Sequence, residues 1–203
     1  MRKIGLLGAV LALYGLAGAQ TKAKSSTTTF RDSETGASFR YSADWTRQPD
    51  AYESVGPDYY VPVIFWSPRH ERRVLITFDP NSYPKTDFTG LSFAYVGMKK
   101  GSAGECASAS EDFVGSQSAN VEPRTVSIGG VPFRSYATAG AGMCHQSFHQ
   151  IYAGYHAGQC YVFETDFNTH CGPDGERPLT ATERAGLMHE LDRVMQSVRL
   201  DGR

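Results

Sequence analysis

The sequence lacks the features that define several large classes of protein. After Leu16 no apolar run approaches the roughly 20 residues of a membrane-spanning helix, so we expect no membrane span in the mature chain. The 20 Lys and Arg residues are balanced by 21 Asp and Glu and form no basic patch of the kind that nucleic acid requires. No two cysteines have C-x-x-C spacing, which argues against a zinc ribbon or a thioredoxin-like site.

The first nineteen residues have the three-part layout of a secretory signal peptide. Arg2 and Lys3 give a positive start, Ile4 to Leu16 is apolar, and residues 17–19 (AGA) form a small-residue cleavage site. The apolar run is too short to cross a bilayer. We therefore expect cleavage near Ala19, a mature chain that begins at Gln20, and a location in the periplasm or outside the cell.

The remainder is expected to form one domain. Residues 20–29 are small and polar and are interpreted as a flexible arm, and residues 30–203 as a single α+β domain. About 184 residues remain after cleavage, which is enough for one sizeable core. All four cysteines (Cys106, Cys144, Cys160 and Cys171) lie in this part. An even number in an exported chain indicates disulfides, although spacing alone leaves three connectivities open.

The order of elements predicts a largely antiparallel sheet flanked by helices. A first helix is expected from Asp87 to Lys100, because apolar residues from Phe88 to Met98 recur at helical spacing; Gly101–Ser110 is a loop or a further helical turn. A second helix begins at Thr180, where the spacing to Glu183 fits a capping box. Strands are expected at Thr27–Ser33, Ala37–Ser42, Val61–Ser67, Arg72–Asp79, Pro123–Ile128 and Val131–Ala139, followed by a long hairpin, Met143–Tyr155 and Gln159–Phe167.

Two segments carry a resemblance to a known family. Residues 35–45 (TGASFRYSADW) resemble the G-x-x-F-x-Y-P-x-x-W motif of the PsbP-like family, the extrinsic photosystem protein and its non-photosynthetic relatives, with Ser42 where that family commonly has proline. Residues 128–140 (IGGVPFRSYATAG), the hairpin and residues 191–200 (LDRVMQSVRL) are similar to its Gly-Gly strand, hairpin and closing helix. The resemblance implies an αβα sandwich with a binding or accessory role, and transfers no catalytic residue.

The long hairpin allows its register to be derived. If Ala157-Gly158 is a two-residue loop, Phe148 faces Phe167 and Tyr152 faces Phe163, an agreement of aromatic pairs on one side. The same register places Cys144 opposite Cys171, within disulfide range, and turns Cys160 to the other face. We therefore favour Cys144–Cys171, with Cys106–Cys160 as the second bridge.

The other face of the hairpin carries a polar set: His145, His149, Glu164, Asp166 and His170. A metal site is one interpretation, but residues four apart on a strand are about 13 Å apart. Two ligands of one zinc ion are only about 3.3–3.5 Å apart. On this argument only His145 and His170 could share an ion. We expect a solvent-facing polar surface, no stoichiometric zinc and no cofactor.

Two further features could carry a function. Cys144 beside His145, or Ser147 near His149 and Asp166, supplies the residue types of a hydrolase, without a recognisable nucleophile motif. The loop Pro49–Pro62 and its flank hold aromatic residues that could form a binding surface or cover the sheet edge: Tyr52, Tyr59, Tyr60 and Trp66.

The sequence favours an exported, disulfide-bonded, non-catalytic domain that binds a protein or small-molecule partner. A secreted hydrolase or metal-dependent enzyme that uses the His/Asp/Ser face of the hairpin is the first alternative. An envelope inhibitor or stress protein is the second.

Overall fold

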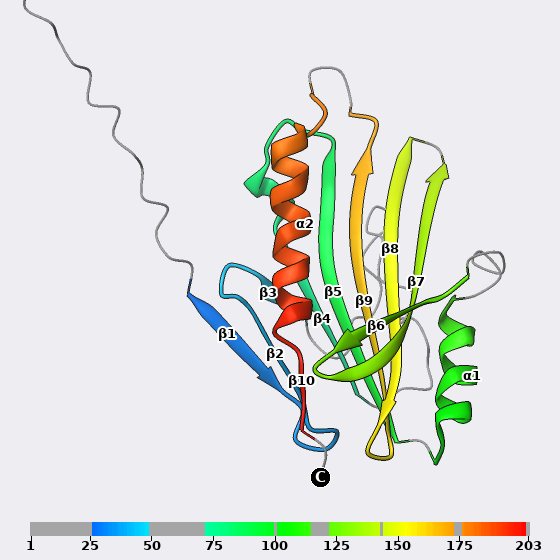
Figure 1. Ribbon diagram of the computed structural model, residues 1–203. Helices are drawn as coiled ribbons and strands as arrows, with labels where there is room; N and C mark the ends of the chain where they lie inside the picture. The colour runs from blue at the N-terminus through cyan, green and yellow to red at the C-terminus, as the bar shows by residue number, and fades with distance from the viewer. Residues whose placement is uncertain are drawn as a thin grey trace, which may run out of the picture.

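In the described part of the chain, two antiparallel sheets and two helices make up the fold (Figure 1). The computed structural model describes residues 26–48, 72–99, 101–114, 122–142, 144–172 and 176–201. The signal segment and the expected strand Val61–Ser67 lie outside these residues. The strands are β1 (Thr27–Arg31), β2 (Ala37–Ser42), β3 (Thr46–Arg47), β4 (Arg72–Phe78), β5 (Phe88–Lys99), β6 (Arg124–Ile128), β7 (Val131–Gly142), β8 (His145–His156), β9 (Gln159–His170) and β10 (Arg199–Leu200). The helices are α1 (Ala103–Val114) and α2 (Ala181–Gln196), with a short 3₁₀ turn at Pro80–Ser82.

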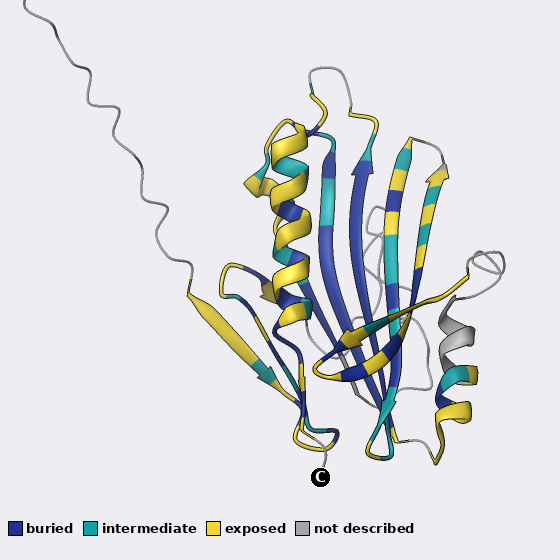
Figure 2. Ribbon diagram, in the orientation of Figure 1, coloured by how far each residue is buried: buried dark blue, intermediate teal, exposed yellow. Residues whose placement is uncertain are grey.

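The larger sheet has seven strands in the order β3-β4-β5-β9-β8-β7-β6, and the smaller has the order β1-β2-β10. Every strand pair in both sheets is antiparallel. β5 and β9 are dark along nearly their whole length in Figure 2, because the centre of the large sheet is covered on both faces. The expected α+β class with a largely antiparallel sheet and flanking helices is confirmed. No helix in the described part of the chain is long and apolar enough to cross a membrane.

The register expected for the long hairpin is confirmed. Phe148 pairs with Phe167 and Tyr152 with Phe163 across β8 and β9. Ala157 and Gly158 form the two-residue turn, and both have positive φ (49° and 77°), as tight hairpin turns of this length require. Since side chains alternate along a strand, this turn fixes which residues of β8 and β9 share a face.

Both expected disulfides are present. Cys144 and Cys171 flank the open end of the hairpin with Cα atoms 4.8 Å apart, and the Cys171 amide donates to the Cys144 carbonyl at 2.6 Å. Cys160, near the turn end of β9, is joined to Cys106 of α1 with Cα atoms 5.4 Å apart. One bridge therefore closes the hairpin, and the other attaches α1 to it.

The prediction of a helix from Asp87 to Lys100 is wrong, because Phe88–Lys99 forms strand β5. Phe93 and Tyr95 lie on one face of the sheet, and Ala94 and Val96 on the other, all essentially inaccessible to solvent. A central strand buried on both faces is apolar at successive positions, so part of its pattern also matches a helical stripe. The first helix is instead α1, which overlaps most of Gly101–Ser110. For that stretch the sequence allows either a loop or a further helical turn.

One face of the large sheet packs against α2 and the smaller sheet. Helix α2 begins at Thr180 with the expected capping box, in which Glu183 Oε2 accepts from the Thr180 amide at 2.8 Å. Its apolar stripe faces an aromatic core around Phe163, whose ring lies 5.3 Å from Tyr95 and 5.8 Å from Phe133 between centroids. The buried positions of that stripe are Leu187, Leu191 and Val194, followed by Val198.

The smaller sheet is attached to the larger one by a buried polar network. Thr35 Oγ1 lies 2.8 Å from Asp32 Oδ2 and 2.6 Å from the Tyr95 hydroxyl, and the Tyr161 hydroxyl donates to the Thr35 carbonyl at 2.6 Å. The β1–β2 turn is thereby held against the central strands β5 and β9, near the β8–β9 turn. Strand β1 already begins at Thr27, so residues 27–29, assigned above to the flexible arm, are paired with β2.

The opposite face of the large sheet has a second, smaller core that α1 covers at one end. Its members are Leu75, Ala94, Val96, Met98, Cys106, Ile151, Ala153, Cys160 and Val162. The polar set of the hairpin continues along this same face toward the open end of β8 and β9. The polar set therefore adjoins a hydrophobic cluster.

The Cys144–Cys171 bridge should contribute markedly to stability, since it closes a loop with a sequence separation of 27. The chain-entropy model gives such a bridge about 3–4 kcal/mol, within a typical total of about 5–15 kcal/mol. We expect Cys144→Ser and Cys171→Ser to lower the melting temperature by similar amounts, and the double variant to lose no more than either. Thermal unfolding measures this. Additive losses would contradict a direct bridge, and removal of Cys106–Cys160 is the independent control.

Candidate functional site

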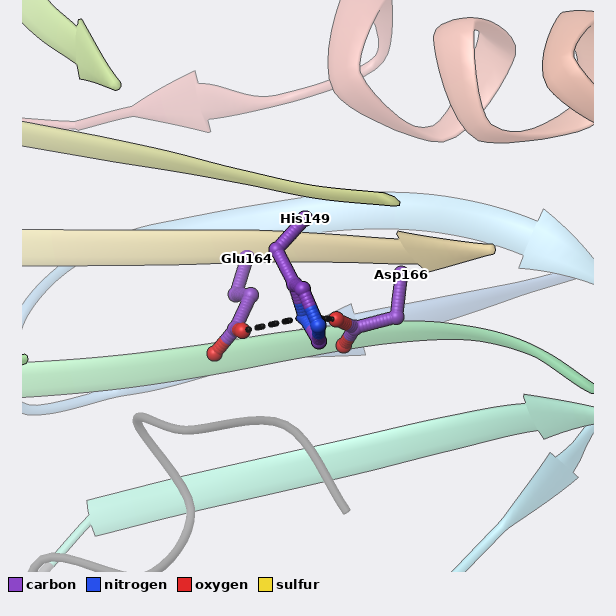
Figure 3. A group of neighbouring side chains, drawn as sticks. All are labelled: His149, Glu164 and Asp166. Atoms are coloured by element: carbon purple, nitrogen blue, oxygen red, sulfur yellow. Dashed lines mark ion pairs between the residues drawn. The ribbon is translucent and has the colours of Figure 1, made fainter. Parts of the chain in front are cut away.

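Three polar side chains of the hairpin meet on the buried face of the large sheet. His149 of β8 lies directly opposite Asp166 of β9, and Glu164 lies two residues before Asp166 on the same face. Figure 3 shows the imidazole between the two carboxylates. His149 Nδ1 is 3.4 Å from Glu164 Oε1 and forms an ion pair with Asp166 Oδ1. We call these three residues the carboxylate–histidine cluster.

The cluster is buried, contrary to the solvent-facing surface expected from the sequence. The Glu164 side chain has no exposed area, and those of Asp166 and His149 are 1% and 14% exposed. The expectation failed because the alternation of β8 and β9 shows that these residues share a face, whereas neighbouring elements decide whether that face is covered.

Electrostatics within the cluster favour a proton on His149. Burial opposes the charged imidazole, but the hydrogen-bonding carboxylates of Asp166 and Glu164 outweigh this and raise the His149 pKa to about 10. Burial, and then repulsion from Glu164, raise the Asp166 pKa to about 7, although His149 and Ser92 act in the opposite direction. The two carboxylates thus share one positive charge in a region of low polarity.

A third strand supports the cluster. Ser92 of β5 pairs with Asp166 in the sheet, and its hydroxyl donates to Asp166 Oδ2 at 3.2 Å. Asn168 follows two residues after Asp166 on the same face of β9, and its Oδ1 is buried without a hydrogen-bond partner in the described part of the chain. Neither residue is predicted from the sequence. Ser92 lies on strand β5, whose apolar pattern also fits a helix.

The two outer histidines of the polar set lie apart from the cluster. His145 and His170 pair at the open end of the hairpin, with ring centroids 6.4 Å apart. His170 Nε2 lies 3.4 Å from Glu176 Oε2. The argument that only His145 and His170 could share an ion is wrong, because ligand atoms of His149, Glu164 and Asp166 all lie within 4.8 Å of one another. Residues four apart on one strand are too distant to share an ion, whereas Glu164 is the diagonal neighbour of His149 on the adjacent strand.

The nucleophiles considered for a hydrolase are Cys144 and Ser147, and neither forms a described hydrogen bond with His149. Cys144 is bonded to Cys171 and has no free thiol. Ser147 is buried on the same strand as His149, two residues away, and the described hydrogen bonds include none between them. His149 Nδ1 faces the two carboxylates rather than a hydroxyl (Figure 3).

A second candidate site lies on the other side of the molecule. We call it the α2 groove: an open cavity of about 980 Å³ between α2, the start of β1 and the end of β2. Its aromatic wall is formed by Trp45, Phe78 and Tyr83, with 5.9 Å between the ring centroids of Trp45 and Phe78. The helix side presents Gly186 and Leu187, with a polar edge of His189, Glu190 and Arg193.

The groove continues along the helix into a second hollow of about 350 Å³. The two hollows share Thr27, Ser42, Glu190 and Arg193 in their linings. This surface is not predicted from the sequence, because its aromatic residues come from three separate segments. The aromatic loop expected as a binding surface, with Tyr52, Tyr59, Tyr60 and Trp66, lies outside the described residues.

Comparisons with known proteins give structural likeness without a close relative. No protein-family model matches the chain, and no curated protein matches it. A Bacteroides thetaiotaomicron protein of known structure is similar with a TM-score of 0.45 and 12% identity over 86% of this chain, which spans 48% of that protein. Mycobacterium tuberculosis LpqN, described as involved in cell envelope biogenesis, has a TM-score of 0.43 and 12% identity over 89% of this chain and 87% of its own.

The third similar structure is cyanobacterial PsbP from Synechocystis, with a TM-score of 0.43 and 12% identity over 91% of this chain and 98% of its own.

In metal-free protein, His149 should keep its proton well above neutral pH. Because its folded pKa of about 10 exceeds the ordinary value of 6.5, the charged form stabilises the fold fully below about pH 6.5, and this contribution is lost as the pH approaches 10. NMR titration of the imidazole nitrogens, assigned with His149→Gln, measures this directly. Deprotonation of His149 at or below pH 6.5 would contradict the buried ion pair.

Proposed function

We propose that this protein is an exported, disulfide-bonded binding domain that holds a small amphipathic ligand in the α2 groove and catalyses no reaction. The observation that carries this proposal is the groove itself. Its volume of about 980 Å³ is at the upper end of the roughly 300–1,000 Å³ typical of ligand pockets.

The lining of the groove suggests the chemistry of the ligand. Trp45, Phe78 and Leu187 offer an apolar floor, suited to a hydrocarbon or aromatic portion. Arg193 and His189 lie at the edge with Glu190, and Arg193 Nη1 is 3.0 Å from Glu190 Oε1. A polar end group could exchange with this exposed ion pair at small cost, because surface ion pairs contribute little to stability.

Export is supported by two independent features. The start of the chain has the layout of a signal peptide. All four cysteines are paired in disulfides, and such bonds persist mainly in oxidising compartments outside the cytoplasm.

The proposal that the protein catalyses no reaction is supported by the partners that the candidate catalytic residues have. The carboxylate–histidine cluster is buried, and its histidine lies against two carboxylates. In the described part of the groove lining, Ser42 donates to Asp44 at 3.2 Å, and no described hydrogen bond joins a serine to His189.

The test of export uses protein purified from the exported fraction, whose N-terminal sequence should begin at Gln20 or within a few residues of it.

The test of ligand binding uses 1-anilinonaphthalene-8-sulfonate, an amphipathic anion, as the probe, in a Trp66→Phe background that leaves Trp45 as the only tryptophan. We expect one bound probe per chain, with energy transfer from Trp45. Gly186→Leu should weaken binding at least tenfold, since a Cβ at Gly186 meets no atom within 4 Å and the added side chain would fill the groove.

The matched control is Ala185→Leu, which adds the same side chain to an exposed neighbour that does not line the groove. Equal binding by the Gly186→Leu and Ala185→Leu variants would refute the groove as the site. Intact Met1 on protein found only in the cytoplasm would refute export. Hydrolysis of p-nitrophenyl acetate that is lost in Ser147→Ala would support the hydrolase alternative instead.

A further inference from the structure

We propose that the carboxylate–histidine cluster is a binding site for one divalent transition-metal cation, held by His149, Glu164 and Asp166. This site is separate from the α2 groove and lies on the opposite face of the large sheet. The inference therefore goes beyond the proposed function, and either can fail without the other.

The geometry suits a single ion. One ligand atom from each of the three residues lies within 4.8 Å of the other two. With bonds of about 2.0–2.2 Å to nitrogen and oxygen, two ligands of one ion are separated by roughly 3–4 Å. His149 Nδ1 and Glu164 Oε1, at 3.4 Å, already have such a separation. Small side-chain rotations would bring the third ligand into place.

Charge balance supplies the driving force. Glu164 and Asp166 are buried carboxylates that sit two residues apart on one strand. A buried carboxylate is costly unless a positively charged group or an ion lies against it. A divalent cation held between the three side chains would contact both carboxylates at once.

The surroundings resemble a built site rather than a chance encounter of side chains. Ser92 donates to Asp166 Oδ2, the oxygen that does not face His149, and would orient that carboxylate as a ligand. Asn168 Oδ1, on the same face of β9, is a buried oxygen without a described partner. It is a further oxygen ligand on the face of β9 that carries Asp166.

The donor set selects among metals. One imidazole nitrogen with two carboxylate oxygens suits zinc or manganese. Calcium prefers six to eight oxygen ligands, and magnesium retains several waters, so neither matches a buried three-residue set. His149 is the most exposed of the three, with 14% of its side chain accessible, and provides the route for ion entry.

The test uses untagged mature protein with both disulfides intact, first stripped with EDTA. Calorimetric titration with zinc should give one ion per chain, and elemental analysis after dialysis should recover it. Zinc should also raise the melting temperature, because a ligand that binds only the folded state stabilises it. Calcium and magnesium should produce no comparable shift.

Variants separate this site from other histidines. His149→Gln and Asp166→Asn, both nearly isosteric, should abolish tight zinc binding. Ser92→Ala should weaken it about tenfold, since supporting residues of metal sites typically contribute 10–100-fold in affinity. His170→Gln, on the same face but paired with Glu176, is the matched control and should bind as the wild type does.

Two results would overturn the proposal: stripped protein that takes up no zinc or manganese, or zinc binding unchanged in His149→Gln and Asp166→Asn. If those two variants fail to fold, Ser92→Ala decides, because it leaves all three ligands in place. Unchanged zinc affinity in Ser92→Ala would then count against the site.

Discussion

The structure depends above all on the register of the β8–β9 hairpin. The turn at Ala157-Gly158 sets this register, and the Cys144–Cys171 bridge holds it at the far end. A slip of β9 by one residue against β8 would exchange the two faces of β9. It would move Phe163 and Phe167 out of the aromatic core under α2 and separate His149 from Asp166. One register therefore positions both the hydrophobic core and the polar cluster.

The two faces of the large sheet carry different candidate functions. On one face, α2 and the β1–β2 hairpin leave an open groove with an aromatic wall, which suits a small ligand. On the other, His149 and two carboxylates are enclosed beside the smaller core, which suits an ion. Strand β9 contributes Phe163 to the first face and Glu164 to the second. An ion bound to Glu164 would therefore stiffen a strand that also forms the core beneath α2. It would do so without contact with a ligand in the α2 groove.

The sequence predicts this fold best where local chemistry decides the outcome. The turn, the aromatic cross-strand pairs and the capping box at Thr180 all depend on neighbouring residues, and they led to the correct register, both disulfides and α2. Strand β5 was taken for a helix because it is buried on both faces, a condition set by elements far away in the chain. For the same reason, Ser92 was missed and the burial of Glu164 was not foreseen.

The most direct test of the account is zinc-edge anomalous diffraction from crystals of the mature protein grown with zinc. The β8–β9 register and the charge of the cluster predict one strong peak, bounded by the side chains of His149, Glu164 and Asp166. Such a peak would confirm both the pairing of the strands and the identity of the ligands. The absence of a peak there, or a peak only at His145 and His170, would contradict the cluster as a metal site.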